Sequence, residues 1–448
     1  MDALTLARIQ FAANISFHIL FPSISIGLIW FLLFFKIMYN RAKDKKWLDA
    51  YEFWVKIFAL CFALGVVSGV TMSFQFGTNW PGFMNKVGNI AGPLLAYEVL
   101  TAFFLEATFL GIMLYGFKKV SSRVHTLSII LVAIGTTASA FWIIALNSWM
   151  QTPTGFIIKA DKVYAVDWVK IVFNPSMIYK FSHMMIASFL TSAFLIAGIS
   201  AYCCLRSKSQ NMTHFYSMKL SVYTASLLIL LQIIIGDLHG LNSFEHQPAK
   251  VAAMEGIWDT EKGAAFRLFA IPDESKKRNH FEILIPNLSS IILTHKLDGE
   301  IKGLKDFEYH PPVMPVFFAF RVMLGVGILM LLASWSSSFF LLKRKRLSTF
   351  NLKILVYMTF SGWIATLAGW YTAEIGRQPW LVYGILKTVE AQAKNIESGM
   401  VASSLILYLI IYVMLIISFI FIIFYLAKNS IKKSNLYYEE VKKNGNSL

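Results

Sequence analysis

Nine long apolar runs constrain this chain more than any other feature of its sequence. They cover residues 14–38, 53–76, 92–117, 126–149, 181–204, 217–236, 315–342, 351–373 and 400–427. Runs of this length match the ~20 residues that an α-helix needs to cross a bilayer. Because hydrocarbon offers no partners for free backbone groups, only helices are plausible here. The sequence therefore predicts an all-α integral membrane protein with a bundle of about nine transmembrane helices.

Composition supports this class and excludes others. Hydrophobic residues make up 56% of the 448 residues, and charged residues only 15%. A formal net charge of +16 would suggest a nucleic-acid partner in a soluble protein, but here the basic residues concentrate in short loops between apolar runs. We therefore predict no nucleic-acid binding. The three cysteines lack metal-ligand spacing and indicate neither a disulfide framework nor a thiolate metal site.

The basic clusters predict how the chain is oriented in the membrane. They follow the first, third, fifth, seventh and ninth runs, at residues 41–46, 118–123, 206–219, 343–346 and 428–433. With nine spans, all of these clusters lie on one side, and short loops rich in Lys and Arg face the cytoplasm. This pattern predicts the N-terminus outside and the C-terminus in the cytoplasm.

The sequence divides into three parts. Residues 1–236 hold the first six expected helices, residues 237–312 form a polar external loop, and residues 313–448 hold the last three helices and a basic tail. The loop is too long for a tight connection, and connections of this length are usually functional or disordered. We therefore treat it as a candidate binding segment.

The loop begins with turn-forming residues at 236–240. A short amphipathic helix that carries Lys250 and Glu255 is expected to follow. Taken alone, these two charges would form a solvated helix face.

Ligand-type and ionisable residues collect in the outer half of the predicted membrane region. At about 1.5 Å of rise per helical residue, they fall beneath the polar loop, and only Glu106 reaches toward the middle. The others are His18, Glu98, His183, Arg321, Met323 and Glu374. Ionisable residues are costly inside a membrane, so their clustering at one depth indicates a functional site.

The densest group lies at residues 369–380, where the eighth run ends. This stretch carries Glu374, Arg377 and three large aromatic residues. The carboxylate could bind a cation or metal, and the planar arginine fork could hold a carboxylate or phosphate. Alternatively, the stretch is an interfacial belt in which the aromatic rings lie at headgroup level and the charges face water.

Simpler explanations exist for the other residues. A single histidine in a transmembrane helix often makes an interhelical hydrogen bond, and methionine fills gaps in packing. Two carboxylates on one helix, Glu98 and Glu106, suit a proton path better than packing, because buried charge is expensive. Two alternative functions remain: a secondary transporter that uses these carboxylates, and a cytochrome that passes electrons on without reducing oxygen.

As a set, the residues suit haem. Imidazole and thioether form a recognised axial pair for haem iron, and imidazole or carboxylate could hold further irons. Arginines and tryptophans near the outer surface suit haem propionates and ring faces. These groups in one layer, beside a large external loop, are typical of a multi-haem electron carrier.

Four motifs resemble one family. Residues 6–11 (Leu-Ala-Arg-Ile-Gln-Phe) and 18–22 (His-Ile-Leu-Phe-Pro) resemble the N-terminus of subunit I of cytochrome bd-type quinol oxidases. Residues 320–325 (Phe-Arg-Val-Met-Leu-Gly) and the stretch 369–380, which ends in Gly-Arg-Gln-Pro-Trp, are similar to the same family. The resemblance extends over essentially the whole chain. The polar loop is short, as in the group that includes the cyanide-insensitive oxidases.

The resemblance implies three haems as cofactors. They would be a low-spin haem b, a high-spin haem b, and either haem d or a further haem b at the oxygen site. His183 and Met323 would be the axial ligands of the low-spin haem b. His18 and Glu374 would each ligate one of the other two haems, and the resemblance leaves open which residue serves which haem.

Proton-transfer roles also follow from the resemblance. Glu98 and Glu106 would belong to a proton path near the oxygen-reducing centre. Trp370, one turn before the carboxylate ligand, would sit among the haems.

The remaining implied roles concern charge and quinol. Arg321 and Arg377 would neutralise haem propionates. Lys250 and Glu255 would bind quinol or accept its protons. Both pairs would act near the outer membrane face.

The implied protein is a haem-containing subunit of a terminal respiratory oxidase in the bacterial cytoplasmic (inner) membrane. It would oxidise ubiquinol or menaquinol near the outer face and reduce oxygen to water. Because the protons for water would come from the cytoplasm, turnover would build a proton gradient by vectorial chemistry without pumping. A second membrane subunit is expected as a partner in the lipid bilayer, and a small accessory subunit is common in the family.

Overall fold

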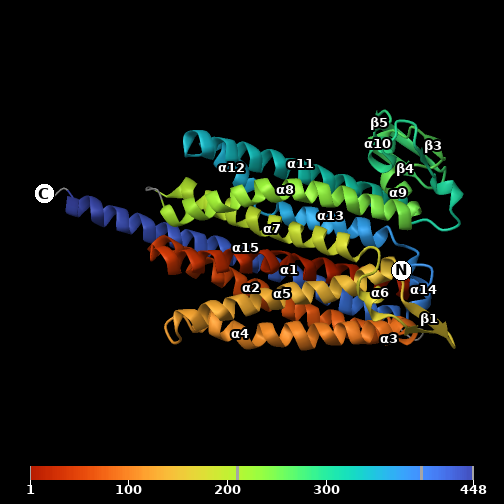
Figure 1. Cartoon of the computed structure of the whole chain (residues 1–448), viewed down its shortest axis with the longest axis horizontal. Coiled ribbons are helices and arrows are strands. Elements are labelled where there is room, and N and C mark those ends of the chain that lie inside the picture. Colours follow the sequence, from red (N-terminus) through yellow and green to blue (C-terminus); the bar gives the residue numbers. More distant parts are fainter. Residues whose placement is uncertain (1, 208–210, 394–396, 446–448) are drawn as a thin grey trace.

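The computed structural model describes residues 2–207, 211–393 and 397–445. Within these ranges nine helices are long and apolar enough to cross a membrane, which confirms the number predicted from the apolar runs. The helices form one elongated bundle, with the N-terminus at the end that also carries the polar loop (Figure 1). The all-α membrane fold is thus confirmed, while the direction in which the bundle crosses the membrane stays a prediction.

Seven spans are unbroken helices. They are α1 (Ala3–Ala42), α2 (Lys45–Thr78), α5 (Ser122–Gln151), α7 (Met177–Arg206), α8 (Met212–His246), α11 (Val313–Arg344) and α15 (Ser398–Gly445). Two spans are interrupted. The third consists of α3 (Pro81–Glu98), the π-helix η1 (Val99–Phe103) and α4 (Phe104–Tyr115), and the eighth consists of α12 (Thr349–Tyr357) and α13 (Ser361–Ile375).

Side-chain caps define where several spans begin. The Asp2 carboxylate accepts a hydrogen bond from the backbone N–H of Thr5 at 2.7 Å, and Ser121 Oγ accepts one from Val124 at 3.3 Å. Such caps satisfy N–H groups that have no partner inside the helix. The sequence therefore fixes these helix starts locally, before any packing.

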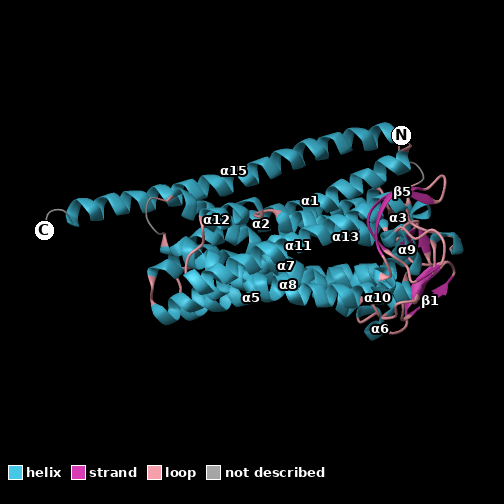
Figure 2. Ribbon diagram, turned by 90° about the horizontal axis from the view of Figure 1, so that it is seen from above, coloured by secondary structure: helices cyan, strands magenta, loops and turns pink. Residues whose placement is uncertain are grey.

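The centre of the bundle is formed by α1 and α7. In their most apolar segments 78% and 72% of the residues are buried inside this chain, compared with 17% for α15. The large side chains Phe21, Trp54 and Phe194 fill the main core around these two helices. Figure 2 shows α15 along one edge of the bundle, where most of its apolar surface faces outward. The outer helices therefore present apolar surface to lipid or to another protein.

Short elements cover the loop end of the bundle (Figures 1 and 2). The polar loop contains α9 (Pro248–Glu255), β3 (Glu261–Lys262), β4 (Phe266–Asp273), β5 (Arg278–Ile285), α10 (Leu288–Thr294), β6 (Glu300–Ile301) and the 3₁₀ helix η2 (Leu304–Asp306). Strands β4 and β5 form an antiparallel hairpin, and β3 pairs with β6. Two further connections add β1 (Phe156–Lys159), β2 (Lys162–Ala165), α6 (Trp168–Val172), β7 (Trp380–Val382), β8 (Leu386–Lys387) and α14 (Thr388–Ala391).

The expectation of a turn at residues 236–240 is wrong. Helix α8 continues through these residues to His246, so the polar loop begins ten residues later than the boundary at 237 supposes. Glycine lowers helix propensity by about 1 kcal/mol, but tertiary packing overrides this local cost. A Cβ at Gly236 would lie 3.3 Å from Cε1 of His183, so this glycine makes room for the imidazole on α7. The short helix with Lys250 and Glu255 is present as α9.

Candidate functional site

A polar network surrounds Glu374 at the end of α13. Its Oε1 accepts hydrogen bonds from Asn147 Nδ2 at 3.0 Å and from Gln151 Nε2 at 3.2 Å, both on the last turns of α5. Its Oε2 pairs with Arg377 Nη2. Lys180 Nζ, on the first turn of α7, donates to Asn147 Oδ1 at 2.7 Å. Three separate spans therefore converge on one carboxylate.

The network carries more positive than negative charge. Lys250 reaches into it from α9 and donates to Gln151 Oε1 at 2.6 Å and to Gln247 Oε1. Lys180, Lys250 and Arg377 are all buried, and Glu374 is the carboxylate that they share. Buried charges need partners, so this excess of cations indicates a place for an additional anionic group.

Arg377 shows where such an anion could bind. Its Nε and Nη1 are buried and have no hydrogen-bond partner in the part of the chain that the structure describes. A carboxylate is the natural partner for these two N–H groups, because it matches the planar guanidinium fork.

Burial and neighbouring charges also act on Lys250. Desolvation lowers the pKa of this amine well below its usual value, and the nearby Lys180 lowers it further, while Glu374 opposes the shift. Loss of hydration disfavours the charged form of a buried lysine. Lys250 can therefore be neutral at a much lower pH than an ordinary lysine.

His183 and Met323 each face a glycine on a neighbouring helix. His183 Nε2 lies 3.1 Å from Gln232 Nε2 of α8, while its Nδ1 is buried without a partner among the described residues. The ring lies against Gly236, as described above. A Cβ at Gly369 of α13 would lie 3.0 Å from Met323 Sδ on α11. Each glycine therefore lets the neighbouring helix pack directly against the ligand-type side chain, and the ring centroid of His239 lies 5.6 Å from that of His183.

The same relationship occurs a third time, at His18 on α1. Its Nδ1 lies 3.0 Å from Ser68 Oγ on α2. A Cβ at Gly69, the next residue on α2, would lie 3.3 Å from His18 Cε1. Three ligand-type side chains therefore pack directly against a glycine of a neighbouring helix, an approach that a Cβ at the glycine would obstruct.

Glu98 and Glu106 lie on either side of the π-helix η1 and both face α5. Ser139 Oγ donates to Glu98 Oε1 at 2.8 Å, and a Cβ at Gly135, one turn away on α5, would lie 2.6 Å from Glu106 Cγ. Eight residues of α-helix would turn these carboxylates about 80° apart, and the extra residue of a π-helix reduces this angle to about 20°. The Oε1 atom of Glu106 is buried and without a partner in the described ranges.

The sequence of this chain matches a known family along almost its whole length. The family model described as "Cytochrome bd terminal oxidase subunit I" matches residues 6–431. The chain belongs to this family. The resemblance found in the four sequence motifs is thereby confirmed, and as a bd-family subunit the chain is part of a terminal oxidase of the bacterial cytoplasmic membrane.

Individual relatives of this bd-family chain cover most of its length. "Cytochrome bd ubiquinol oxidase subunit 1" of Bacillus subtilis (strain 168) is 36% identical over 440 residues, which are 94% of this chain and 93% of the relative. "Cytochrome bd-II ubiquinol oxidase subunit 1" of Escherichia coli (strain K12) is 33% identical, with 94% and 95% covered. The solved bd oxidase from Geobacillus thermodenitrificans superposes with a TM-score of 0.88 at 30% identity, over 96% of this chain and 99% of that one.

Membership of the bd family implies haem cofactors, and the residues of this chain fit them. Haem iron takes imidazole, thioether or carboxylate ligands, and the buried Nδ1 of His183 has no hydrogen-bond partner among the described residues. The acidic side chains of haem need cationic partners, and two buried nitrogens of Arg377 have no hydrogen-bond partner in the described ranges. The fit rests on this chain's own donor set and does not distinguish one haem type from another.

The structure brings some predicted site residues together and separates others. Lys250 joins Glu374 and Arg377 in one network, although its helix was expected to face water. Glu255, the other half of the predicted quinol pair, is equally buried but lies with Arg321. Lys250 and Glu255 therefore point into two different parts of the site.

Arg321 has its partners in the polar loop. Its Nε and Nη2 donate to the Arg267 carbonyl at 2.9 and 2.7 Å, its Nη1 bonds to the Met254 carbonyl, and its Nη2 lies 3.4 Å from Glu255 Oε2. The predicted role of Arg321 at a propionate therefore remains a prediction, while these contacts connect α11 to the loop.

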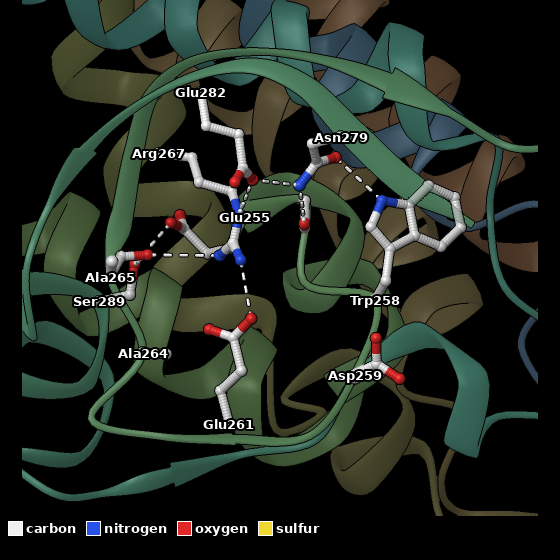
Figure 3. A network of polar contacts seen from close by, with 12 residues as sticks. Glu255, Trp258, Asp259, Glu261, Ala264, Ala265, Arg267, Asn279, Glu282 and Ser289 are labelled. Atoms are coloured by element: carbon white, nitrogen blue, oxygen red, sulfur yellow. Dashed lines mark hydrogen bonds and ion pairs between the residues drawn. The ribbon is translucent and has the colours of Figure 1, made fainter. Parts of the chain in front are cut away.

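Figure 3 shows the network on which Glu255 lies. Ser289 Oγ donates to Glu255 Oε2 at 2.7 Å. Arg267 donates to Glu261 at 2.7 Å and to Glu282 at 2.9 Å, so it ties β3 and β5 to β4. The loop thus holds Glu255 through Ser289, while Arg321 of α11 contacts the same carboxylate oxygen.

Trp370 lies half-buried beside Ile144 and Met177, between α5, α7 and α13. Phe141 and Met184 pack against the same small apolar cluster. The ring therefore lies among the three spans that converge on Glu374.

Sequence reasoning missed Lys180, Gln151 and Ser139. Lys180 lies one turn before His183, so a cation at helical spacing from a predicted ligand could have pointed to it. Gln151 and Ser139 are common polar residues, and they matter only because α5 brings them against Glu374 and Glu98 of other helices. The sequence held no signal for them.

Proposed function

We propose that this chain oxidises quinol at the loop end of the bundle and that the electrons reduce oxygen to water. The observation that carries the proposal is the buried, positively charged network around Glu374, which needs an additional anionic group and lies directly beneath the polar loop. Relatives are named as ubiquinol oxidases, and one as a putative menaquinol oxidase. The proposal leaves both quinols as candidates.

We further propose four haem ligands. His183 and Met323 would hold a low-spin haem b, and His18 and Glu374 would hold a high-spin haem b and the haem at the oxygen site, which is either haem d or a further haem b. Bound haems would supply the electron transfer between quinol and oxygen. Arg377 would bind a propionate, because its free N–H groups require an acceptor.

Lys250 and Glu255 would handle the protons of quinol. A neutral Lys250 amine could accept a proton, and burial favours that neutral form. Glu255 accepts hydrogen bonds from Ser289 and Arg321, and so presents a fixed acceptor to a quinol hydroxyl. The released protons would leave at the loop end, which the charge pattern predicts to be outside.

Glu98 and Glu106 would carry protons toward the oxygen site. Both carboxylates face α5, and Glu106 Oε1 has no hydrogen-bond partner among the described residues. This arrangement suits a path in which one carboxyl holds a proton and passes it to the next group. Trp370 lies near the proposed ligand Glu374 and would shield the site from water. Uptake from the cytoplasmic side would create a proton gradient without a pump.

We infer a second membrane subunit as the partner of this chain. In the most apolar segments of α15 and of the third span, only 17% of the residues are buried inside this chain. A partner helix bundle would cover these faces, and a small accessory subunit could cover others.

A reduced-minus-oxidised absorption spectrum of the complex with its second subunit tests the proposal. We expect three haems, and pyridine haemochrome analysis would tell haem d from haem b at the oxygen site. His183→Ala should remove the low-spin band and quinol oxidation together. An unchanged spectrum in this variant would contradict the assignment of His183. A complex without haem would instead favour the alternative that the buried carboxylates belong to a secondary transporter.

A further inference from the structure

We propose that the hairpin β4–β5 lies on the membrane surface, with its apolar side chains among the lipid headgroups and upper acyl chains at the loop end of the bundle. The proposal concerns the membrane environment of the hairpin and does not depend on the reaction at the site.

The hairpin buries one arginine and exposes several apolar side chains. Arg267 is buried and pairs with Glu282, whereas Phe281 is 80% exposed and Ile283 55% exposed. Phe269 pairs with Ile283 across the strands, so these two exposed side chains share one face. Phe266 and Ala270 are buried as well, so the hairpin has apolar side chains on its buried and its exposed surface, whereas the exposed face of a hairpin in water is commonly polar. Figure 3 shows the polar groups gathered around Arg267 beneath the strands.

The exposed apolar surface continues the lipid-facing surface of α11. The ring centroid of Phe269 lies 6.1 Å from that of Phe318. Met314 and Val322 lie one turn on either side of Phe318, and both are exposed. The apolar side of the hairpin and this helical stripe therefore form one surface, and its helical part lies within a membrane-spanning helix.

The depth of the hairpin agrees with the membrane boundary. Arg321 on α11 binds the Arg267 carbonyl, so the start of β4 lies level with Arg321. The basic end of α11 at Lys343 is 22 residues, or about 33 Å, further along the helix, close to the ~30 Å hydrocarbon thickness. Arg267 thus lies near the edge of the hydrocarbon, and Phe269 lies in the headgroup layer, where aromatic side chains are favoured.

The turn of the hairpin supplies charges that suit headgroups. Lys276, Lys277 and Arg278 follow one another there. The preceding carboxylates bind within the protein, since Asp273 accepts hydrogen bonds from Ser275 and Glu274 accepts one from the Val313 N–H. All three cations are exposed, and although Lys276 also interacts with the Asp273 carboxylate, the group suits lipid phosphates, which attract juxtamembrane Lys and Arg.

The backbone also favours the headgroup layer over the hydrocarbon. Strand β5 pairs with β4 on one edge only, within the part of the chain that the structure describes. Its other edge carries polar backbone groups that hydrocarbon cannot satisfy but hydrated headgroups can.

Nitroxide accessibility tests the proposal in the complex reconstituted into vesicles of phosphatidylglycerol and phosphatidylethanolamine. Spin labels at Phe281→Cys and Ile283→Cys, in a background without Cys61, Cys203 and Cys204, would be compared with a lipid control at Leu329→Cys and a water control at Lys302→Cys. Both controls are exposed positions, so labelling disturbs no packing.

The measurement is the ratio of collisions with oxygen to collisions with a water-soluble nickel chelate. We expect this ratio at both hairpin positions to rise from the water control toward the lipid control. A ratio like that at position 302 would overturn the proposal. Low collision rates with both agents would overturn it too, because they would mean that another subunit or a second copy covers the hairpin.

Discussion

Arg321 Nη2 lies 3.4 Å from Glu255 Oε2 and connects the helix that carries Met323 to the polar loop. Four of the five guanidinium N–H groups of Arg321 are used within the loop. The guanidinium carbon also lies 4.0 Å from the centroid of the Phe317 ring. A proposed quinol residue and a proposed haem ligand are therefore coupled through one side chain, which lysine could not replace because it lacks the planar fork.

The first prediction concerns this pair. We expect Arg321→Lys to lower quinol oxidation and the stability of the loop, because Glu255 loses its arginine partner and the Arg267 carbonyl loses its two donors. In a double-mutant cycle with Glu255→Gln, the two changes should be non-additive by about 0.5–3 kcal/mol in unfolding free energy. Arg278→Lys, at the exposed turn of the hairpin, is the matched control and should change neither quantity. Additive effects would show that the two side chains act independently.

The fold could be predicted from sequence because its main constraint is local. Each apolar run is long enough to declare a span by itself, and alternating basic loops support the count. The turn predicted from local pattern at residues 236–240 is wrong, because these glycines remain inside α8. Gly236 makes room for the imidazole of His183 on another helix, which no local pattern reveals.

The site was predictable only in part, for the same physical reason. Candidate ligands were found because ionisable residues are rare in membranes, but Lys180 and Gln151 gain importance only where α5, α7 and α13 meet. Lys250 was expected in water, and it is buried because α9 turns inward beneath the loop. Sequence spacing on one helix does not report which distant helix lies opposite.

The glycines beside the candidate ligands give a second prediction. We expect Gly236→Ala to displace His183, since the new Cβ would lie 3.3 Å from Cε1. Overpacking of this kind typically costs ~1–3 kcal/mol. Gly240→Ala on the same helix adds a methyl group with nothing within 4 Å and is the control.

The readout is the low-spin band of the reduced-minus-oxidised spectrum. It should shift or lose intensity in Gly236→Ala and remain unchanged in Gly240→Ala. Identical spectra for the two variants would contradict the proposal that His183 is a ligand of the low-spin haem.

Lys250 predicts a pH dependence. Burial lowers its pKa well below the usual value of about 10.4, so the neutral, proton-accepting amine forms as the pH rises through this lowered pKa. Quinol oxidation should therefore increase with pH over that range. Lys250→Gln should remove this limb of the profile, and Lys250→Arg should stay slow because its charge persists.

The experiment measures quinol oxidation against pH at saturating oxygen. Lys262→Gln, which removes an exposed lysine of the same loop, should keep the wild-type profile. A Lys250→Gln enzyme with the wild-type rise would exclude this amine as the proton acceptor.

The last prediction tests the proton-path role of Glu106 by a substitution at Gly135, a residue that cannot carry a proton itself. A Cβ at Gly135 would lie 2.6 Å from Glu106 Cγ, too close for any real contact, so Gly135→Ala must push the carboxylate away from α5. Because Cγ is near the backbone, a change of rotamer at the end of the side chain cannot relieve the clash. Glu98 would stay in place, because Ser139 of α5 holds it, so the proton path between the two carboxylates would be broken.

We expect kcat for oxygen reduction to fall in Gly135→Ala while the KM for quinol stays constant, since the polar loop is untouched. Gly111→Ala on α4, with nothing within 4 Å of its added methyl, should leave both values unchanged. Equal kcat in the two variants, with proton uptake after an oxygen pulse also equal, would place the proton path elsewhere.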